Sequence, residues 1–593
     1  MPTGGTATAG TRVWSPANNA RPLAPPGSGR HHRGMPRVRA LLQGLALFLL
    51  AAGLGAQAGP QTGGVSSIDT PTLKTWLTYI ASDELQGRQV YSEGLGLAAS
   101  YIADHLARWG VKPAGDDGSY FQTVRILGVR TDSRSTVAVT VNGETRTFAD
   151  GDGFFLPRNM GGSQTLASSD VLFLGYGLHA PQEGHDDYAG FDPAGKVIVW
   201  LGAAGPEAAG ARALAGRART ALERGAVAVI APRTTGARRA ASSGAAADRS
   251  PAAADFTTAG RLDQPRAPVV SAGPELLEHL FSGSAPGYAE LAARAERREP
   301  LPGFPLEGVK VTITVAPEYS VVTTRLSRNV VGIVEGTDPR LKGTYVSIGA
   351  HYDHIGYHQT LETPTGGAPF GCPGQTRREV RPGDIVNNGA DDDGSGTVAL
   401  MAIARAFALG PKPRRSLLFI WHTAEESGLQ GSQYNADHPV VPNEDVIAHL
   451  NMDMVGRNRC DDPAQANTVY LVGSDRISTD LHNLSEETNA ALREPLTLDY
   501  ELNDPADPQS LYTRSDHYSY AAKGIPVIFY TTGLHRDYHF VTDEIERIEF
   551  EKMTRVARLV FLTGERLANL EHRPVRDNKG PRVGVGRGGM LDR

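Results

Sequence analysis

The stretch GADDDGSGTVALMAIARAFA, residues 389–408, decides the fold. It opens as a glycine-rich turn that contains three consecutive aspartates, and the apolar residues after the turn recur at helical spacing. The sequence therefore predicts a turn that leads into a buried helix. Asp392 would lie at the entrance of this helix, where the backbone dipole favours an anionic group.

Three apolar segments elsewhere in the chain end in side chains that can bind a metal ion. They are TYVSIGAHYDH (344–354), RSLLFIWHTAEE (415–426) and IAHLNMDM (447–454). Each reads as a buried strand followed by polar groups. We therefore expect an open α/β sheet covered by helices on both faces, with a site at the carboxyl ends of the strands.

The candidate ligands follow one another along the chain in the order His, Asp, Glu-Glu, Asp, His. Zinc binds imidazole nitrogen and carboxylate oxygen. A pair of zinc ions about 3.5–4 Å apart also needs a bridging carboxylate, ligands for each outer face and a general base beside the bridging water. The residues that fill these roles are His351, Asp392, Glu425, Glu426, Asp453 and His539. The ordered set predicts a two-zinc hydrolase.

Some residues near the candidate ligands can hold a ligand in position, and others are of a ligand type but are not expected to bind metal. Asp353 stands two residues after His351, and a carboxylate at that spacing can accept the second imidazole N–H and fix the tautomer. We expect His517, in RSDHYSY, to have either a supporting or a structural role. The other histidines near the motifs are expected to be structural or at the surface: His354, His358, His422, His449 and His535.

These motifs resemble the co-catalytic di-zinc aminopeptidase family. That family contains secreted bacterial leucyl-type aminopeptidases and, more distantly, glutamate carboxypeptidases, glutaminyl cyclases and the transferrin receptor. The resemblance extends over roughly residues 64–571. It implies the family's mixed central sheet with helices on both faces, of the phosphorylase/hydrolase-like type.

The same resemblance distributes two Zn²⁺ over the candidate residues. It implies that Asp392 bridges the ions. His351 and Asp453 would complete the first site, and Glu426 and His539 the second.

The resemblance also assigns the catalytic roles. Glu425 would be the general base, and Tyr538, which matches an oxyanion-stabilising tyrosine present in some members, would hold the developing charge. After His539 the chain reads FVTDE where the family commonly has T-P-x-D-T, and Asp543 remains a candidate partner of the site.

The expected activity is that of an exopeptidase acting on peptides, and specifically of an aminopeptidase. The alternatives on the same fold are a carboxypeptidase or dipeptidase and a glutaminyl cyclase, although the cyclases use a single zinc and the ligand set here is complete. A non-catalytic receptor-like module is a further alternative. Lost ligands would be its signature, and none is lost.

The N-terminal region predicts export to the periplasm or the medium. MPRVRALLQGLALFLLAAGLGAQAG, which starts at Met35, has a charged start, an apolar stretch and a small-residue cleavage site at residues 56–58. Met35 is therefore a candidate initiator. A membrane anchor is disfavoured because the apolar run is shorter than the ~20 residues of a spanning helix and no cysteine follows for lipidation. Residues 1–58 contain six Arg and no other charged residue, so their removal changes the formal net charge from −6 to −12 and disfavours nucleic acid as a partner.

Length and pattern predict several domains. The chain has 593 residues, of which 40% are hydrophobic. From about residue 151 the pattern resembles a protease-associated domain inserted ahead of the core, within which residues 240–256 have too few large apolar residues to pack. The expected parts are a leader with signal peptide (1–58), an N-terminal part of the catalytic domain (64–150), the insert (151–305), the zinc peptidase domain (306–571) and a disordered tail (572–593).

The chain has only two cysteines, too few for a disulfide scaffold, and their spacing matches no metal-binding pattern. An oxidising compartment would favour a single bridge between Cys372 and Cys460, and both a bridge and two free thiols remain open.

Overall fold

The structure, a computed structural model, describes residues 63–181, 184–207, 211–233, 255–358, 371–372, 374–505, 507 and 509–579. The predicted leader and signal peptide, most of the Ala-rich segment and the tail beyond residue 579 lie outside these ranges. Among the described residues, no helix combines the length and the apolar character that crossing a bilayer requires.

The first of two large sheets has the strand order β12-β2-β16-β18-β17-β19-β22-β20-β21, with β1 paired to β16. Four neighbouring strands in its centre, β18, β17, β19 and β22, run parallel, whereas β16 and β20 pair antiparallel to them. The sheet is therefore mixed, as expected. Its strands are β1 (Lys112–Pro113), β2 (Phe121–Ser133), β12 (Asp255–Thr258), β16 (Pro317–Val334), β17 (Tyr345–His351), β18 (Ser416–His422), β19 (Val446–Met452), β20 (Thr468–Val472), β21 (Thr497–Asp499) and β22 (Val527–Thr531).

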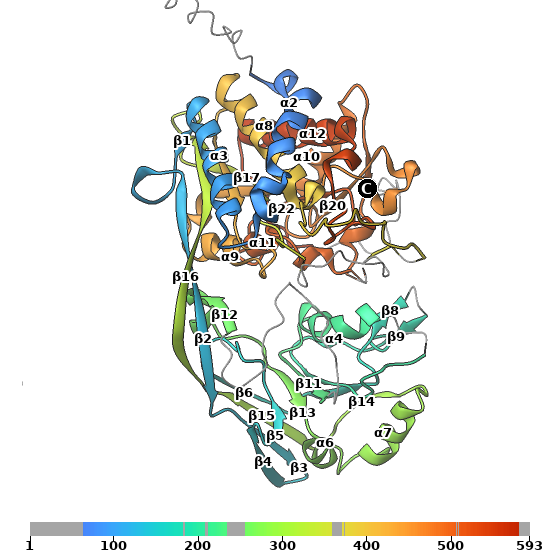
Figure 1. The fold of residues 1–593 in the computed structure, drawn as a ribbon. Helices are drawn as coiled ribbons and strands as arrows, with labels where there is room; N and C mark the ends of the chain where they lie inside the picture. Colours follow the sequence, from blue (N-terminus) through green and yellow to red (C-terminus); the bar gives the residue numbers. More distant parts are fainter. Residues whose placement is uncertain are drawn as a thin grey trace, which may run out of the picture. The chain divides into compact units, whose positions relative to one another are not determined.

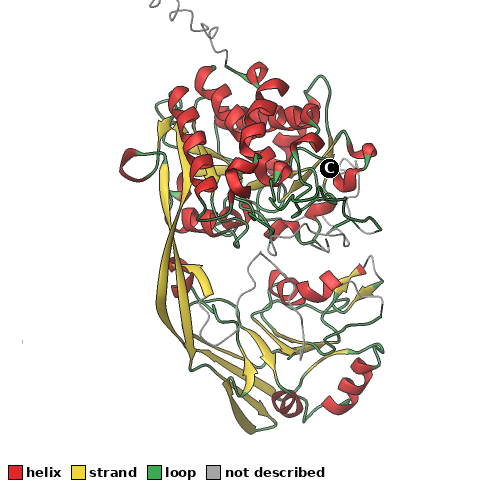
Figure 2. Ribbon diagram, viewed as in Figure 1, coloured by secondary structure: helices red, strands yellow, loops and turns green. Residues whose placement is uncertain are grey.

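Helices cover both faces of this sheet (Figures 1 and 2). Along β18, Leu417, Phe419 and Trp421 enter one hydrophobic core, and Leu418 and Ile420 enter another. This two-sided burial explains the unbroken apolar run of the sequence. The helices of the first core are α2 (Thr70–Ile80), α3 (Glu93–Arg108), α8 (Gly396–Leu409), α10 (Thr479–Ala490) and α12 (Phe550–Asn569). On the other face α11 (His517–Ala521) packs against β19 and β22, and α9 (Gln430–Asp437) packs against α11.

The second sheet has the order β14-β7-β10-β11-β13-β5-β4-β3-β15-β6 and its own hydrophobic core. Its strands are β3 (Thr136–Val141), β4 (Glu144–Asp150), β5 (Gly153–Phe155), β6 (Gln164–Ser168), β7 (Val171–Leu174), β10 (Val197–Val199), β11 (Ala228–Pro232), β13 (Val269–Ala272), β14 (Gly303–Pro305) and β15 (Val309–Val315). The remaining elements of this part of the chain are β8 (His179–Ala180), β9 (His185–Asp186), α4 (Ala211–Glu223), α5 (Ala259–Asp263), α6 (Pro274–Leu280) and α7 (Tyr288–Glu296).

The second sheet includes strands on both sides of the predicted insert boundaries at residues 151 and 305. β3, β4 and β15 lie outside them but pair within the second sheet. Conversely, β12 pairs with β2 of the first sheet and includes Asp255 and Phe256, which the sequence assigned to an unpacked loop. Alternating apolar residues indicate a strand but not the sheet to which it belongs.

A disulfide joins Cys372 and Cys460, whose Cα atoms are 5.4 Å apart. The bond connects two loops that are 88 residues apart in the chain. Of the two states that the sequence left open, the structure therefore has the bridge.

Candidate metal centre

Neighbouring parallel strands bring the candidate ligands together. His351 is the last residue of β17, Asp453 follows β19 directly, and Glu425 and Glu426 lie in the turn after β18. Asp392 lies in the turn that leads into α8. The carboxyl ends of the strands therefore form the site, as expected for an α/β sheet.

The first group of ligands consists of His351, Asp392 and Asp453. Nε2 of His351 lies 3.3 Å from Oδ1 of Asp392 and 3.6 Å from Oδ1 of Asp453. One candidate ligand atom of each residue lies within 4.8 Å of the others. His351 Nε2 is buried and has no hydrogen-bond partner among the described residues. A buried imidazole nitrogen that faces two carboxylates without a hydrogen bond fits a zinc ion held between them.

The second group shares Asp392 with the first. Nε2 of His539 lies 3.1 Å from Oδ2 of Asp392 and 2.9 Å from Oε2 of Glu426. Asp392 thus presents Oδ1 to His351 and Oδ2 to His539. One carboxylate that faces two sets of donors with separate oxygens has the arrangement of a metal bridge.

His354 also belongs to this second group, although the sequence assigned it a structural or surface position. The side chain is fully buried, and its Nδ1 lies 2.7 Å from Oε1 of Glu426 and 3.9 Å from Oδ2 of Asp392. It forms a second potential metal group with these two residues. Its position three residues after His351, in the loop that follows β17, was the available signal.

Contacts with histidines determine the pKa values of Asp392 and Glu426. Burial alone would raise the pKa of Asp392, but the imidazoles of His351 and His539 that face it hold it well below its ordinary value. Burial and Asp392 likewise oppose ionisation of Glu426, and His539 and His354 outweigh them, which lowers the pKa of Glu426 to about 2. Both side chains are therefore anionic at neutral pH, as ligands must be.

Glu425 has a different environment from its neighbour. Its Oε2 is 4.0 Å from His351 Nε2, and the side chain is only 9% exposed. Burial raises the pKa of Glu425 well above its ordinary value, and Glu426 and Asp453 add to this effect. A raised carboxyl pKa next to a metal group suits a residue that takes up and releases a proton.

Asp353 contacts the centre through other atoms than we expected. His351 Nδ1 lies 3.1 Å from the main-chain carbonyl oxygen of Asp353, and 3.8 Å from its carboxylate. The carboxylate accepts hydrogen bonds from the main-chain N–H groups of Glu425 and Glu426. Asp353 therefore holds the Glu-Glu turn through its carboxylate, while its main-chain carbonyl oxygen faces the imidazole of His351.

Tyr538 lies beside the second group. Its ring stacks on His539 with a centroid distance of 3.9 Å, and its hydroxyl accepts a hydrogen bond of 3.0 Å from Arg514. Burial raises the pKa of the Tyr538 hydroxyl well above its ordinary value. The phenol therefore keeps its proton at neutral pH and can donate it in a hydrogen bond.

Two further carboxylates fix the ligand loops by binding main-chain N–H groups. Asp543, the candidate partner in FVTDE, accepts hydrogen bonds from the N–H groups of Asp391 and Asp392. Asp393 accepts from those of His351, Gly396 and Met454 and so joins three ligand-bearing segments.

Arg88, from the N-terminal segment SDELQGR, binds the backbone of the turns that carry the candidate ligands. Among the described residues, its fully buried guanidinium donates to main-chain carbonyl oxygens alone, those of Ile80, Tyr352, Asn388, Gly389 and Asp392. Sequence reasoning did not find this role, because the partners of Arg88 are backbone atoms in distant segments.

Ser515 and His517 belong to the Ser-Asp-His segment near the site. Ser515 Oγ donates a hydrogen bond of 2.7 Å to Oδ2 of Asp453, so the Ser-Asp-His segment supports a ligand through its serine. His517 stacks on Phe529, and burial lowers the pKa of His517 to about 3. Of the two roles considered for His517, these contacts favour the structural one.

Comparison with protein families supplies a name for this part of the chain. Residues 329–563 match the model of peptidase family M28. The chain carries a peptidase family M28 domain. All the candidate ligands lie within the M28 match, whereas Arg88 and the second sheet precede it.

Fungal leucine aminopeptidases are among the curated relatives of the M28 domain. Leucine aminopeptidase 1 of Sclerotinia sclerotiorum is 27% identical over 238 residues, which are 38% of this chain and 53% of that protein. Leucine aminopeptidase 1 of Ajellomyces capsulatus strain NAm1 / WU24 is 30% identical over 216 residues, 32% of this chain and 52% of that protein. The chain thus spans about half the length of the curated relatives it matches. A solved aminopeptidase from Aneurinibacillus sp. strain AM-1 has 19% identity and a TM-score of 0.43 over 88% of this chain and 99% of that one.

Proposed function

We propose that this protein is an exported zinc-dependent exopeptidase that removes N-terminal residues from peptides. The observation that carries the proposal is the position of Asp392 in the M28 domain, with one carboxylate oxygen toward His351 and the other toward His539.

The donor set fits two zinc ions. His351 and Asp453 would hold one ion, Glu426 and His539 the other, and Asp392 both. When bound, such a pair lowers the pKa of a shared water and polarises the scissile carbonyl.

Glu425 moves the proton in this reaction. Its carboxylate accepts a proton from the attacking water and returns it to the leaving amine. The raised pKa of Glu425 favours uptake of the proton, and the same carboxyl group can then return it to the leaving amine.

Tyr538 stabilises the charge that develops on the carbonyl oxygen. Its hydroxyl keeps its proton and lies within the reach of Arg514, whose guanidinium orients it. A donor that is already fixed in position costs no reorganisation when the charge appears.

The choice of an aminopeptidase rests on the carboxylates of the site and on the relatives. Glu425 and Asp453 are buried carboxyl groups that can share the binding of a substrate ammonium group. The relatives that match the M28 domain bear the name leucine aminopeptidase.

The proposal includes export from the cytoplasm and an assignment of the second sheet. The disulfide supports an oxidising compartment, in agreement with the predicted signal peptide. We assign the second sheet to the protease-associated-type insert, with its boundaries widened to residues 136–315.

A panel of aminoacyl anilides tests the proposal. We expect the mature protein to hydrolyse anilides with a free amino group and not their N-acetylated forms, to lose this activity on chelation and to regain it with Zn²⁺. Hydrolysis of C-terminal residues only, by the same zinc-loaded protein, would identify a carboxypeptidase and overturn the aminopeptidase assignment.

A further inference from the structure

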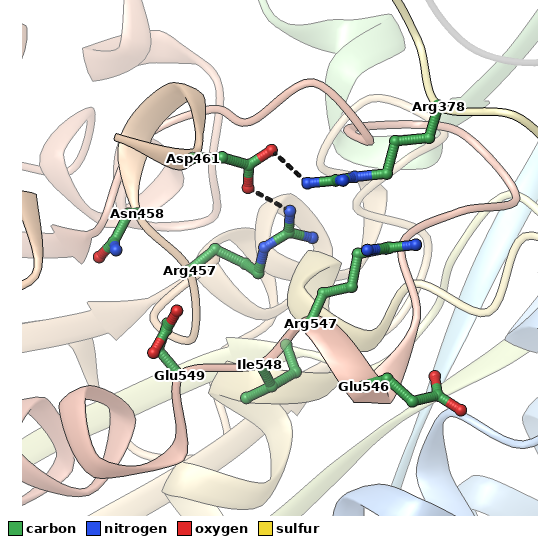
Figure 3. Close-up of a pocket in the computed structure, with 8 residues that line it drawn as sticks. All are labelled: Arg378, Arg457, Asn458, Asp461, Glu546, Arg547, Ile548 and Glu549. Carbon is green, nitrogen blue, oxygen red and sulfur yellow. Dashed lines mark hydrogen bonds and ion pairs between the residues drawn. The ribbon is translucent and has the colours of Figure 1, made fainter. Parts of the chain in front are cut away.

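Arginines line two cavities outside the metal centre, and the two cavities differ in their balance of charge. In the first, of about 400 Å³, Asp461 pairs with both Arg378 and Arg457 (Figure 3). Asp537 accepts hydrogen bonds from the same two guanidinium groups. These carboxylates balance the arginines, so the first cluster is a structural ion-pair network.

The second cavity, of about 300 Å³, has arginines but no acidic side chain among the described residues that line it. It lies between α4, α5, α9 and α11 and the residues that precede the last two helices. Its lining residues are Arg219, Arg261, Gly428, Leu429, Gln433, Thr513 and Tyr518.

Arg261 has no counter-ion in the described part of the chain, where its guanidinium makes neither a hydrogen bond nor an ion pair. Burial lowers the pKa of Arg261 to about 10, Arg266 lowers it further, and Asp437 opposes both effects. Asp437 is itself paired with Lys523, with 2.7 Å between Oδ1 and Nζ. A half-buried cation of this kind is stabilised by an anion in the cavity.

Arg219, on α4, likewise forms no ion pair with a described residue. One carboxylate, that of Glu223, follows it one turn further along the helix. Burial raises the pKa of Glu223, and three arginines oppose the rise: Arg476, Arg219 and Arg224. One carboxylate among three arginines leaves an excess of positive charge on this side of the cavity.

Tyr518 adds a neutral donor to the two guanidinium groups. Burial raises the pKa of its hydroxyl, and so does Glu223, whereas Arg219 and Arg261 oppose the rise. The hydroxyl therefore keeps its proton at neutral pH. Planar forks of N–H groups and a phenol O–H match the two oxygens of a carboxylate.

The cavity adjoins the metal centre on the side of the Glu-Glu turn. Gly428 stands two residues after Glu426, and Thr513 directly precedes Arg514, the partner of the Tyr538 hydroxyl. Two residues of chain span at most about 7 Å. An extended peptide advances about 3.3 Å per residue, so a peptide whose first residue lies at the metal centre reaches the cavity with its second or third residue.

We propose that this cavity binds a carboxylate of the peptide substrate on the C-terminal side of the scissile bond, with Arg261 and Arg219 as its main donors. The inference rests on the proposed aminopeptidase activity, in which a single residue precedes that bond. The carboxylate is the C-terminus of a short peptide or the side chain of an acidic residue at the second or third position. The preferred substrates are therefore peptides that carry a negative charge close to the cleavage site.

Hydrolysis of three peptides by the zinc-loaded full chain tests the proposal. They are leucyl-glycyl-glycine with a free C-terminus, its C-terminal amide, and leucyl-glycyl-glutamic acid with its C-terminus amidated. We expect the wild type to favour a peptide with a carboxylate over leucyl-glycyl-glycine amide by about tenfold or more in kcat/KM, through a lower KM, because charge-assisted hydrogen bonds are gained.

Arg261→Gln should bring this ratio close to one, and Arg261→Lys, which keeps the charge but not the fork, should give an intermediate ratio. Arg146→Gln, which removes an exposed arginine of the second sheet, is the control and should keep the wild-type ratio. The ratio is insensitive to a general loss of folded protein, because such a loss lowers the rates on all three peptides alike.

The two carboxylate-bearing peptides distinguish a free C-terminus from an acidic side chain, and a preference for either supports the proposal. Equal kcat/KM values of the wild type for all three peptides, or the same ratio in the wild type and Arg261→Gln, would overturn it. Leucine anilide, which has no carboxylate, separates this outcome from a failure of the proposed function. Its hydrolysis by a protein without carboxylate preference would overturn the cavity assignment alone, whereas no hydrolysis of the anilide or of any peptide would overturn the aminopeptidase activity itself.

Discussion

Asp392 belongs to both groups of candidate ligands. The two glutamates after β18, Glu425 and Glu426, differ in their contacts and in their pKa values. Glu426 contacts His354 and His539, and its pKa is lowered to about 2. Glu425 has no such contacts, and burial raises its pKa instead. The pKa values of two adjacent glutamates are thus shifted in opposite directions because their surroundings differ.

The first prediction concerns Glu425. Glu425→Gln should keep its zinc content but lose a factor of about 10² or more in kcat/KM, which is the usual contribution of a general base. Zinc analysis and anilide hydrolysis measure the two effects separately. The exposed Glu546→Gln serves as control, and turnover of Glu425→Gln at the wild-type rate would refute the role of Glu425.

The second prediction concerns His354, which orients Glu426 through a contact of 2.7 Å. His354→Gln should weaken zinc binding about 10- to 100-fold, as is typical when a residue that supports a ligand is removed. Competition with a chromophoric chelator measures this affinity. His358→Gln, four residues further on and remote from the ligand contacts described, is the comparison; equal affinities in the two variants would show that His354 only fills space.

The candidate ligands, which the structure brings close together, could be selected from the sequence because their types, order and strand-end positions are all local properties. The roles of His354, Asp353 and Arg88 could not be predicted fully. Their partners are Glu426, main-chain N–H groups and main-chain carbonyls from distant segments, and such pairings exist only after folding.

At the scale of elements, β17, β18 and β19 were predictable because strands buried on both faces read as unbroken apolar runs. β3, β4 and β15 lie outside the predicted insert but pair within the second sheet. Their alternating pattern indicates one buried face, which both sheets can provide, and only the pairing partner distinguishes them.

The third prediction concerns α11 and pH. His517, at the start of α11, has a pKa of about 3 in the folded state because of burial, and about 6.5 when unfolded. Between these values the unfolded chain binds the additional proton, so stability is complete above about pH 6.5 and falls as the pH decreases toward 3. At pH 5 the loss amounts to about 2 kcal/mol.

His517→Phe keeps an aromatic ring against Phe529 but cannot take up a proton. Urea titrations at pH 7 and pH 5 should therefore show a smaller loss of unfolding free energy in this variant than in the wild type. An identical loss in both proteins would exclude His517 as a source of acid sensitivity.

At the scale of the whole molecule, the disulfide connects two loops that are far apart in the chain. Cys460 directly precedes Asp461, and Cys372 precedes the loop that carries Arg378. Replacing both cysteines by serine should lower the free energy of unfolding by about 2–4 kcal/mol, as expected for the loss of a native cross-link. The measurement is a urea titration under non-reducing conditions, and an unchanged midpoint would contradict a stabilising role.

The count of zinc ions required for activity tests the central claim most directly. Chelated protein is titrated with Zn²⁺ while hydrolysis of an aminoacyl anilide is followed, with Asp392→Asn in parallel. We predict that activity saturates at two ions per chain in the wild type and that Asp392→Asn, which lacks the shared carboxylate, neither retains both ions nor recovers activity. Full activity with one ion, or without any metal, would contradict a two-zinc peptidase.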